Sequence, residues 1–245
     1  MPRPPRWPTL SARHVLIDMD YTITYPTSPP EKELLDGLES DSYFLAILRD
    51  LLARSRRLSR PAALKMIRSH CDPDSQCLFT ILDAIGIAAE EYWQAVLDYH
   101  RTHLAAYPDA LDMIRELHSR GFRIYTATTN SRMAALSKLA CAGLATLHGS
   151  PYFSGFFGGD ICEGGKSGPR FFRTILKIGR LAPADCLMVG DDPQMDLASA
   201  KAAGIRQVVL PQRNRIEELV VADDGGIYVN SLSVVPKLLR LKRPC

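Results

Sequence analysis

The sequence predicts an α/β fold, a parallel sheet flanked by helices, in which an all-helical segment is inserted after the first strand. The apolar run Val15-Leu16-Ile17 is typical of a buried strand, and residues 31–104 then follow helical periodicity. From Pro108 onward, expected helices and strands alternate, which is the pattern of parallel strands joined by crossover helices. We therefore predict a core domain at 10–24 and 105–245 and a helical domain at 25–104.

The inserted segment is expected to form four helices, each bounded by a break in the apolar pattern. They cover 31–54, with an interruption at 37–42, and then 62–70, 75–85 and 90–104. Pro61 suits a first helical turn, because that turn leaves the backbone N–H without a partner in any case. Tyr92 and Trp93 lie on the last helix, where packing is the simplest interpretation and a substrate-facing role is the alternative.

The second half of the chain predicts the rest of the sheet. Helices are expected at 110–120, 131–142, 171–179 and 196–203, and strands at 122–127, 186–189 and 207–210. Gly121 and Gly204 follow two of these helices, where a glycine commonly ends a helix. Because parallel strands present their carboxyl ends at one edge, a ligand site is expected at that edge.

Composition limits the function classes. Of 245 residues, 46% are hydrophobic and 23% are charged, which is ordinary for a globular protein, and no apolar run approaches the ~18 residues that span a bilayer. The net charge of +3 is mild, and its basic clusters lack interleaved aromatic residues, so we expect neither a membrane nor a nucleic-acid partner.

The cysteines and the start of the chain bear on location. The six cysteines are scattered without a C-x-x-C pair, which favours a reducing cytoplasm over a disulfide framework or a zinc site. Residues 1–9 are rich in proline and arginine and lack the apolar stretch of a secretory signal, so we expect a disordered lead-in.

The chemistry is expected to begin at Asp18 and Asp20, directly after the first buried strand. Side chains two residues apart share a face of an extended chain, and two like charges repel each other there. Either a cation bridges the two carboxylates or one of them stays protonated. Both conditions are costly in a purely structural segment, and both serve nucleophilic phosphoryl transfer.

Three further loops place polar residues at expected strand ends. They are Thr128-Thr129-Asn130, the Gly164–Pro169 loop with Lys166, and Gly190-Asp191-Asp192 with Asp196 beyond it. Hydroxyl and backbone N–H groups at a helix start can bind an anion, and carboxylates can hold magnesium. Taken singly, the three loops are equally typical of a helix cap, an exposed lysine and a capping turn, so their combination and order carry the argument.

In order and spacing, the four loops resemble the haloacid dehalogenase-like (HAD) superfamily. The family pattern is an Asp-x-Asp-x-Thr loop, a Ser/Thr loop, a lysine, and then Gly-Asp with further acids. The resemblance covers roughly 10–22 and 107–215 and implies a Rossmann-like core. It also implies that 25–104 is a helical cap of the C1 type. Tyr21 departs from the pattern, because a small residue or Asn is more usual there.

The resemblance also implies residue roles. Asp18 matches the nucleophile and Asp20 the general acid and base. Lys166 matches the cation that neutralises the nucleophile and the phosphoryl oxygens. The remaining roles are binding the phosphoryl group, by Thr128, Thr129 and Asn130, and holding Mg²⁺, by Asp18, the Asp20 carbonyl and Asp191.

Two assignments stay open. Thr126, Thr128 and Thr129 lie close together, and we choose Thr128 because six strand residues after Gly121 bring the chain to it. Asp192 and Asp196 are both candidates for supporting or joining the metal shell.

The resemblance implies a Mg²⁺-dependent phosphatase that forms an aspartyl phosphate, and the cysteine pattern leads us to expect it in the cytoplasm. Its expected substrate is a small phosphorylated metabolite: a sugar phosphate, a phosphoglycolate-like compound or a nucleoside monophosphate. Dehalogenase-type members lack the second acid, so Asp20 favours phosphate esters, whose leaving oxygen needs a proton. The alternatives are a phosphomutase, a dehalogenase-type hydrolase, or a non-catalytic binding or regulatory protein on this fold. A monomer or homodimer is expected.

Overall fold

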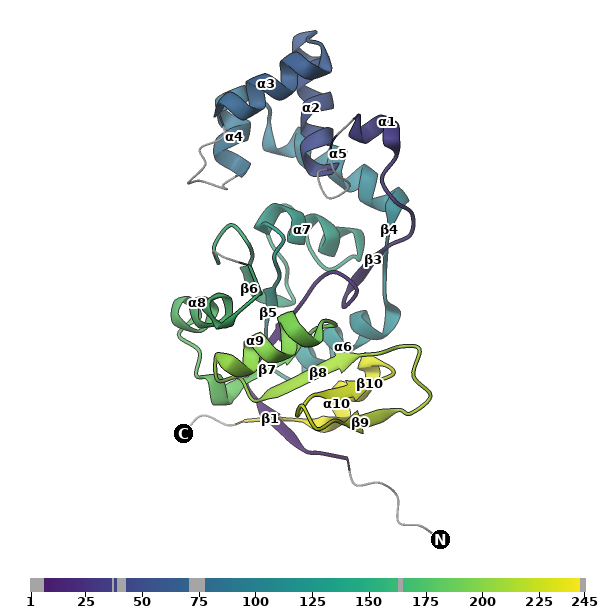
Figure 1. The fold of residues 1–245 in the computed structure, drawn as a ribbon, viewed down its shortest axis with the longest axis vertical. Helices are drawn as coiled ribbons and strands as arrows, with labels where there is room; N and C mark the ends of the chain where they lie inside the picture. Colours follow the sequence, from purple (N-terminus) through teal and green to yellow (C-terminus); the bar gives the residue numbers. More distant parts are fainter. Residues whose placement is uncertain (1–6, 37, 39–42, 71–77, 163–164, 243–245) are drawn as a thin grey trace. The chain divides into compact units, whose positions relative to one another are not determined.

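The computed structural model describes residues 7–36, 38, 43–70, 78–162 and 165–242. The chain forms two compact units (Figure 1). The sheet unit comprises Met1–Tyr25, Ala106–Ala135 and Ser150–Cys245, and the helical unit comprises Pro26–Ala105 and Leu136–Gly149. In the described part of the chain, no helix is both long and apolar enough to cross a membrane.

The sheet unit is built on a seven-stranded sheet with the order β6-β5-β2-β7-β8-β10-β9. Every pairing is parallel except that of β9 with β10. The strands are β2 (His14–Ile17), β5 (Arg123–Ala127), β6 (Phe153–Phe157), β7 (Cys186–Val189), β8 (Gln207–Pro211), β9 (Leu219–Val221) and β10 (Ile227–Val229). A separate parallel pair joins β1 (Leu10–Ala12) to β11 (Leu239–Leu241).

Strand β2 lies between β5 and β7, and the register aligns the ends of all three. Ile17, the last residue of β2, is opposite Thr126 on one side and Val189 on the other. The chain therefore leaves the three strands at one level, with Asp18 following β2 directly. The strand order also reverses direction here, because β5 and β6 lie on one side of β2 and β7 and β8 on the other. Such a switch point is where open parallel sheets bind ligands.

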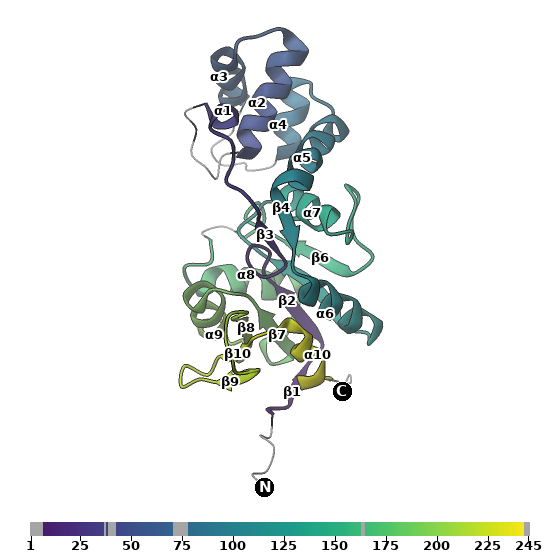
Figure 2. The same cartoon turned by 90° about the vertical axis from the view of Figure 1, so that its right-hand side faces the viewer.

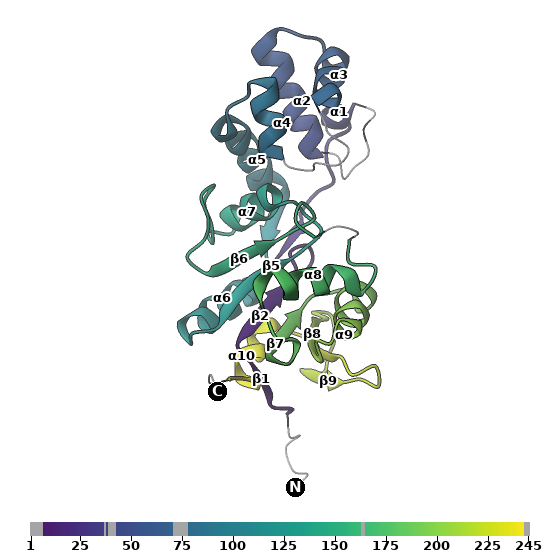
Figure 3. The same ribbon diagram turned by 90° about the vertical axis from the view of Figure 1, so that its left-hand side faces the viewer.

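Helices cover both faces of the sheet (Figures 2 and 3). On one face, α8 (Pro169–Gly179) and α9 (Ser199–Ala202) pack in a buried cluster with Leu16 of β2. Strand side chains alternate between faces, so Val15 and Ile17 point to the other face. That face carries α6 (Pro108–Ser119) and α10 (Val235–Leu238), and α6 buries its apolar side there. Helix α7 (Arg132–Cys141) follows β5.

Among the described residues, the helical unit contains the later part of α7, from Leu136, and five complete helices: α1 (Lys32–Leu35), α2 (Tyr43–Arg56), α3 (Arg60–His70), α4 (Leu78–Ile85) and α5 (Ala89–His103). Arg49 is buried in this unit and donates hydrogen bonds to the carbonyls of Leu34 (2.7 Å) and Leu35 (3.2 Å) at the end of α1, where the Leu35 carbonyl also accepts from the Leu38 N–H at 3.0 Å. Tyr92 and Trp93 are buried on α5, which supports packing as their role. Between the units the chain passes through β3 (Thr24–Pro26) and β4 (Leu104–Ala106), which pair with each other.

The predicted elements match closely where the pattern is strong. Strand 186–189 has its predicted bounds, and the helices predicted over 62–70, 90–104 and 110–120 shift by one or two residues. The helix predicted at 196–203 was placed too late, because a π-helical turn at Pro193–Ala198 precedes α9. Strand β6 and the strands after β8 were not predicted. Residues 1–6, most of 37–42 and 71–77, on which other predictions fall, lie outside the described residues.

Candidate active site

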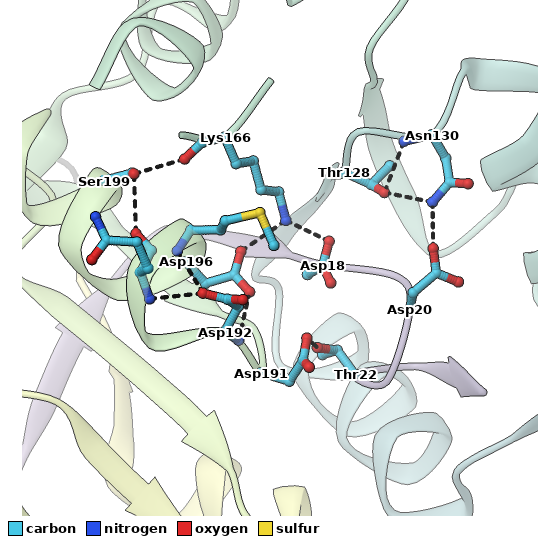
Figure 4. Close-up of polar contacts among 12 residues, drawn as sticks. Asp18, Asp20, Thr22, Thr128, Asn130, Lys166, Asp191, Asp192, Asp196 and Ser199 are labelled. Atoms are coloured by element: carbon cyan, nitrogen blue, oxygen red, sulfur yellow. Dashed lines mark hydrogen bonds and ion pairs between the residues drawn. The ribbon is translucent and has the colours of Figure 1, made fainter. Parts of the chain in front are cut away.

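Polar side chains converge where β2, β5 and β7 end (Figure 4). Asp18 and Asp20 follow β2, Thr128 and Asn130 follow β5, and Asp191 follows β7. Lys166 comes from the loop before α8. The sheet register alone brings three of these loops to one level, and all of these residues belong to the sheet unit. Gly164, the first residue of the predicted lysine loop, lies outside the described residues.

Lys166 is the cation of the cluster. Its ammonium group pairs with Asp18 and, at 2.7 Å, with Asp196, and its side chain is only 4% exposed. Burial raises the pKa of Asp18 to about 7, and Asp196 adds to the rise while Lys166 opposes it. Burial alone would lower the pKa of Lys166, but the two carboxylates outweigh it and raise that pKa, so the lysine stays charged.

Three carboxylates gather against this single lysine. Ligand oxygens of Asp18, Asp191 and Asp196 all lie within 4.8 Å of one another. Burial, with repulsion from Asp18, raises the pKa of Asp191 to about 6. The cluster thus holds more negative charge than Lys166 balances, and its oxygen donors are those that Mg²⁺ prefers. The residues present therefore fit a divalent cation.

In the fourth loop, which follows β7, Asp196 and Asp192 have different roles. Asp192 accepts hydrogen bonds from the backbone N–H groups of Gln194 and Met195, both at 2.7 Å, so it caps the π-helical turn. The other oxygen of Asp196 accepts from the Asp192 N–H at 3.1 Å. Gly190 is required beneath it, because a Cβ at 190 would lie 2.3 Å from the Asp196 carboxyl carbon. Of the two open candidates, Asp196 faces the acid cluster and Asp192 does not.

The hydroxyl groups of Ser199 and Thr22 form hydrogen bonds with residues of this cluster. Ser199 donates to the Lys166 carbonyl (2.7 Å) and so ties α9 to the lysine loop. Thr22, fully buried, donates to Asp191 at 3.4 Å. Neither was singled out from the sequence. Thr22 was visible as the threonine of the Asp-x-Asp-x-Thr pattern, whereas nothing near Ser199 in the sequence marks it.

Asp20 is engaged by different partners from Asp18. The side-chain amide of Asn130 donates to Asp20 (2.7 Å) and to the Thr128 hydroxyl oxygen (2.9 Å). That oxygen also accepts from the Asn130 backbone N–H at 3.2 Å. Figure 4 shows Asp20 directed to Asn130, whereas Asp18 is directed to Lys166. The two carboxylates, close in sequence, are therefore held by different side chains, Asp20 by Asn130 and Asp18 by Lys166.

The structure separates the three threonines after Gly121. Thr126 lies within β5, and its hydroxyl donates to the Phe157 carbonyl at 3.3 Å. Thr129 has an exposed side chain, and its carbonyl lies against Gly159, where a Cβ would come within 2.4 Å. Thr128 is buried beside Asn130. Among the three, Thr128 alone places its hydroxyl in the hydrogen-bond group of Asp20.

Comparisons with known proteins identify a family and several relatives that this chain resembles. A family model described as a haloacid dehalogenase-like hydrolase matches residues 12–204. A phosphoserine phosphatase from Thermus thermophilus is 33% identical over 124 residues, which is 51% of this chain and 48% of that protein. The chain therefore spans about half the length of that curated relative. A phosphoglycolate phosphatase from Neisseria gonorrhoeae is 31% identical over 190 residues, 71% of this chain and 76% of that protein.

A solved structure is similar over most of the chain. The crystal structure of a HAD phosphatase from Thermococcus onnurineus is similar with a TM-score of 0.52 and 25% sequence identity. The similarity covers 92% of this chain and 97% of that one, so it includes both the sheet and the inserted helices.

Proposed function

The chain belongs to the haloacid dehalogenase-like hydrolases, as its sequence predicts, and we propose that it is a Mg²⁺-dependent phosphatase of small phosphomonoesters. The reaction would pass through an aspartyl phosphate on Asp18. Two relatives named as phosphatases, of phosphoserine and of phosphoglycolate, support this chemistry.

The separation of Asp18 from Asp20 carries the proposal. Asp18 lies beside Lys166 and the other acids, which suits a carboxylate that attacks phosphorus. Asp20 lies outside that cluster, held by the Asn130 amide, which suits a group that moves a proton. A halide leaves without a proton, whereas an alkoxide needs one. An intact and separately held Asp20 therefore favours phosphate esters over haloacids.

In the first step, an Asp18 oxygen forms a bond to phosphorus while the bond from phosphorus to the ester oxygen breaks. Asp20 gives its proton to the leaving alkoxide, which departs as an alcohol. In the second step Asp20 takes a proton from water, whose oxygen attacks phosphorus. The acyl phosphate bond breaks, inorganic phosphate leaves, and Asp18 is restored.

In this proposal, Lys166 and Thr128 would stabilise the phosphoryl group. Lys166 presents a buried positive charge next to the Asp18 carboxylate, where it would neutralise both the nucleophile and the phosphoryl oxygens. The Thr128 oxygen already accepts two hydrogen bonds from Asn130, which leaves its own O–H proton to donate. We assign that proton, with the backbone N–H of Thr129, to a phosphoryl oxygen.

We propose that Asp18 and Asp191 hold the magnesium together with the Asp20 carbonyl, and that Asp196 supports them while it holds Lys166. The bound ion would supply positive charge that lets Asp18 stay ionised and that offsets the charge of the phosphoryl group. Because Mg²⁺ retains water and shares its shell with phosphate, so few protein ligands suffice.

We further propose that residues 25–104 act as a cap that selects the substrate. The argument is sequence position, because the segment is inserted directly after Asp18 and Asp20. The substrate would be a small phosphorylated metabolite: a sugar phosphate, a phosphoglycolate-like compound, a nucleoside monophosphate or phosphoserine. The scattered cysteines, three of which are free thiols among the described residues, favour the reducing cytoplasm as the place of reaction.

Phosphate release from such a panel tests the proposal, with 2-chloropropionate assayed in parallel for halide release. We expect phosphate release that EDTA abolishes and Mg²⁺ restores, with inhibition by Ca²⁺, whose larger and looser shell disturbs the position of Asp18. Halide release without phosphate release would identify a dehalogenase, and conversion of one phosphate isomer to another would identify a mutase. No turnover of any compound would favour a binding protein.

A further inference from the structure

Arg213 contacts several segments at once beside the nucleophile loop, Asp18–Thr22. Neither its sequence context nor the family pattern predicts these contacts. Arg213 lies just after β8. Its guanidinium group donates to the backbone carbonyls of Tyr21 (3.0 Å) and Thr22 (2.9 Å). The same group pairs with Asp109 at 3.2 Å and stacks on Tyr107, with 3.5 Å from its central carbon to the ring centroid. A planar guanidinium can make all four contacts at once, whereas a point charge cannot.

The turn that Arg213 holds has an unusual backbone. Tyr21 adopts a φ of +56°, in the left-handed region that bulky side chains rarely enter, and its side chain is 54% exposed. The side chain therefore gains little from packing in that conformation. Two carbonyls directed at one guanidinium give the turn a specific partner. The hydrogen bonds from Arg213 thus stabilise a left-handed conformation that the backbone of Tyr21 would not favour by itself.

This turn joins two of the site residues. Asp20 immediately precedes Tyr21, and Thr22 immediately follows it. Asp20 accepts from Asn130, and Thr22 donates to Asp191. A change in the turn would therefore move the acid and base on one side and the support of a metal ligand on the other.

Asp109 and Tyr107, the side chains that Arg213 contacts away from the turn, have further contacts of their own. Asp109, at the start of α6, also accepts from the Leu232 backbone N–H at 2.8 Å and from the Ser231 hydroxyl at 3.3 Å. The N–H of Tyr107 donates to the Ile23 carbonyl at 2.9 Å, and the Tyr107 ring packs against Tyr25 with centroids 4.4 Å apart. Arg213 is therefore fixed against α6 while it reaches the nucleophile loop.

We infer that Arg213 is a positioning residue for the reaction, acting through the Tyr21–Thr22 turn to hold Asp20 and Asp191 in place. The inference rests on the proposed phosphatase function. Since the guanidinium contacts only the turn's backbone carbonyls, α6 and Tyr107 among the described residues, its loss should affect the rate of the chemical step more than the binding of substrate.

The test compares Arg213→Met with Arg215→Met, which removes the same charge two residues away. Arg215 contacts Gln212, Glu217 and Tyr228 and does not touch the nucleophile loop. We expect Arg213→Met to lower kcat about 10- to 100-fold, because small misplacements of reacting groups cost that much. KM should change less than about threefold, and Arg215→Met should keep both constants within about twofold.

Hydrogen exchange provides a measure that does not depend on turnover. The N–H of Tyr21 donates to the Thr24 carbonyl, and those of Ile23 and Thr24 donate to the Met19 carbonyl. A peptide covering these amides should exchange faster in Arg213→Met than in wild type and Arg215→Met, while peptides from β7 and β8 should not. If the methionine variant fails to fold, Arg213→Lys takes its place, because lysine keeps the positive charge but lacks the planar set of guanidinium donors. The kcat of Arg213→Lys should also fall, by at least about fivefold.

The outcomes separate the two claims. If wild type turns over no phosphate ester, the proposed function fails, and with it the inferred effect on rate, whatever exchange shows. If wild type is active, unchanged kcat in Arg213→Met, or in Arg213→Lys where that replaces it, overturns the inference. Unchanged exchange of the Tyr21–Thr24 amides overturns it as well.

Discussion

Strand β2 has an aspartate–lysine pair near each of its ends, and the two pairs differ in burial and in the direction in which the pKa of the aspartate is shifted. At the carboxyl end, Lys166 pairs with Asp18, and the two side chains are 4% and 12% exposed. At the amino end, Lys242 pairs with Asp185, at 38% and 18% exposed. Burial raises the pKa of Asp18 to about 7, whereas the hydrogen bond from Lys242 lowers the pKa of Asp185.

The neighbours explain why one pair type gives opposite shifts. Asp18 shares its lysine with Asp196 and lies close to Asp191, so the negative charges outnumber the positive one in a buried place. Asp185 faces Lys242, Arg13 and His14 near the surface. The comparison teaches that an ion pair marks a functional site when it is buried and further carboxylates crowd its own carboxylate. A partly exposed carboxylate whose charged neighbours are cations is only a modest structural contact.

The largest difference should appear in turnover. Asp18→Asn should lower kcat by at least about 10⁴-fold, because an amide cannot form the acyl phosphate and replacing a nucleophile has effects of that order. Asp185→Asn makes the same chemical change at the other end of the strand and should keep the wild-type rate. Steady-state phosphate release with both purified variants checks this. Comparable rates in Asp18→Asn and wild type would disprove the assignment of the nucleophile.

The two lysines should differ next. Lys166→Met should reduce kcat/KM about 10²- to 10³-fold for every substrate alike, because the lost charge acts on the phosphoryl group that all substrates share. Lys242→Met removes an exposed partner of Asp185 and should leave kcat/KM unchanged. The measurement is a substrate panel run with both variants. If Lys166→Met instead reordered the substrates, the lysine would be recognising the organic part of the molecule.

Much of this could be predicted from the sequence, because the site lies where strong patterns end. The strand before Asp18, the helix ending at Gly121 and the strand before Gly190 are local signals, and together they fix the edge of the sheet. The family match confirms the predicted family and the α/β fold, while the roles of Asp18, Asp20, Lys166 and Asp191 remain predictions.

Contacts between distant segments could not be predicted in the same way. Arg213 reaches Tyr21, 192 residues earlier, and Ser199 reaches Lys166, 33 residues earlier. No local pattern encodes such pairs. The π-helical turn at Pro193–Ala198 was missed because helical periodicity assumes an α-helix, and β6 was missed because Phe153-Ser154-Gly155-Phe156-Phe157 has glycine at its centre and no clean alternation.

Stability should respond to pH in a way that distinguishes Asp18 from Asp185. In EDTA, the folded protein keeps the Asp18 proton up to about pH 7, whereas the unfolded chain releases it near 3.8. The free energy of unfolding should therefore fall as pH rises through that interval. Asp18→Asn should reduce this slope, leaving the smaller part that the raised pKa of Asp191 contributes, and at pH 8 it should be more stable than wild type by about 0.5–2 kcal/mol.

Asp185→Asn gives the opposite result in the same experiment. Its pKa is lowered on folding, so its ionised form contributes stability above pH 3.8 that is lost as the pH falls through the folded-state value. The variant should be slightly less stable than wild type at neutral pH. Urea unfolding at several pH values in EDTA measures both curves. A stabilised Asp185→Asn, or a destabilised Asp18→Asn, would reverse the contrast between the two ends.

The smallest expected effect is at His14, the first residue of β2. Burial, together with Arg123 and Arg13, lowers its pKa from 6.5, and Asp185 only partly opposes this. Below about pH 6.5 the unfolded chain therefore binds a proton that the folded protein resists, and the His14 contribution to the free energy of unfolding falls as pH decreases. His14→Phe keeps a ring beside Tyr125, whose centroid is 5.9 Å away, and removes a buried nitrogen without a hydrogen-bond partner.

When the pH is lowered from 8 to 5, the free energy of unfolding of His14→Phe should therefore rise relative to that of wild type by up to about 1 kcal/mol. His118→Phe is the matched control, because His118 is exposed and also lies beside a tyrosine ring, that of Tyr152. It should follow the wild-type slope. If the free energy of unfolding of His14→Phe and that of wild type changed with pH in parallel, burial of His14 would not be the cause of the slope. The slopes expected from His14 and Asp18 have opposite signs, so the two contributions partly cancel in the metal-free protein where their pH ranges overlap, because each end of β2 opposes a different ionisation.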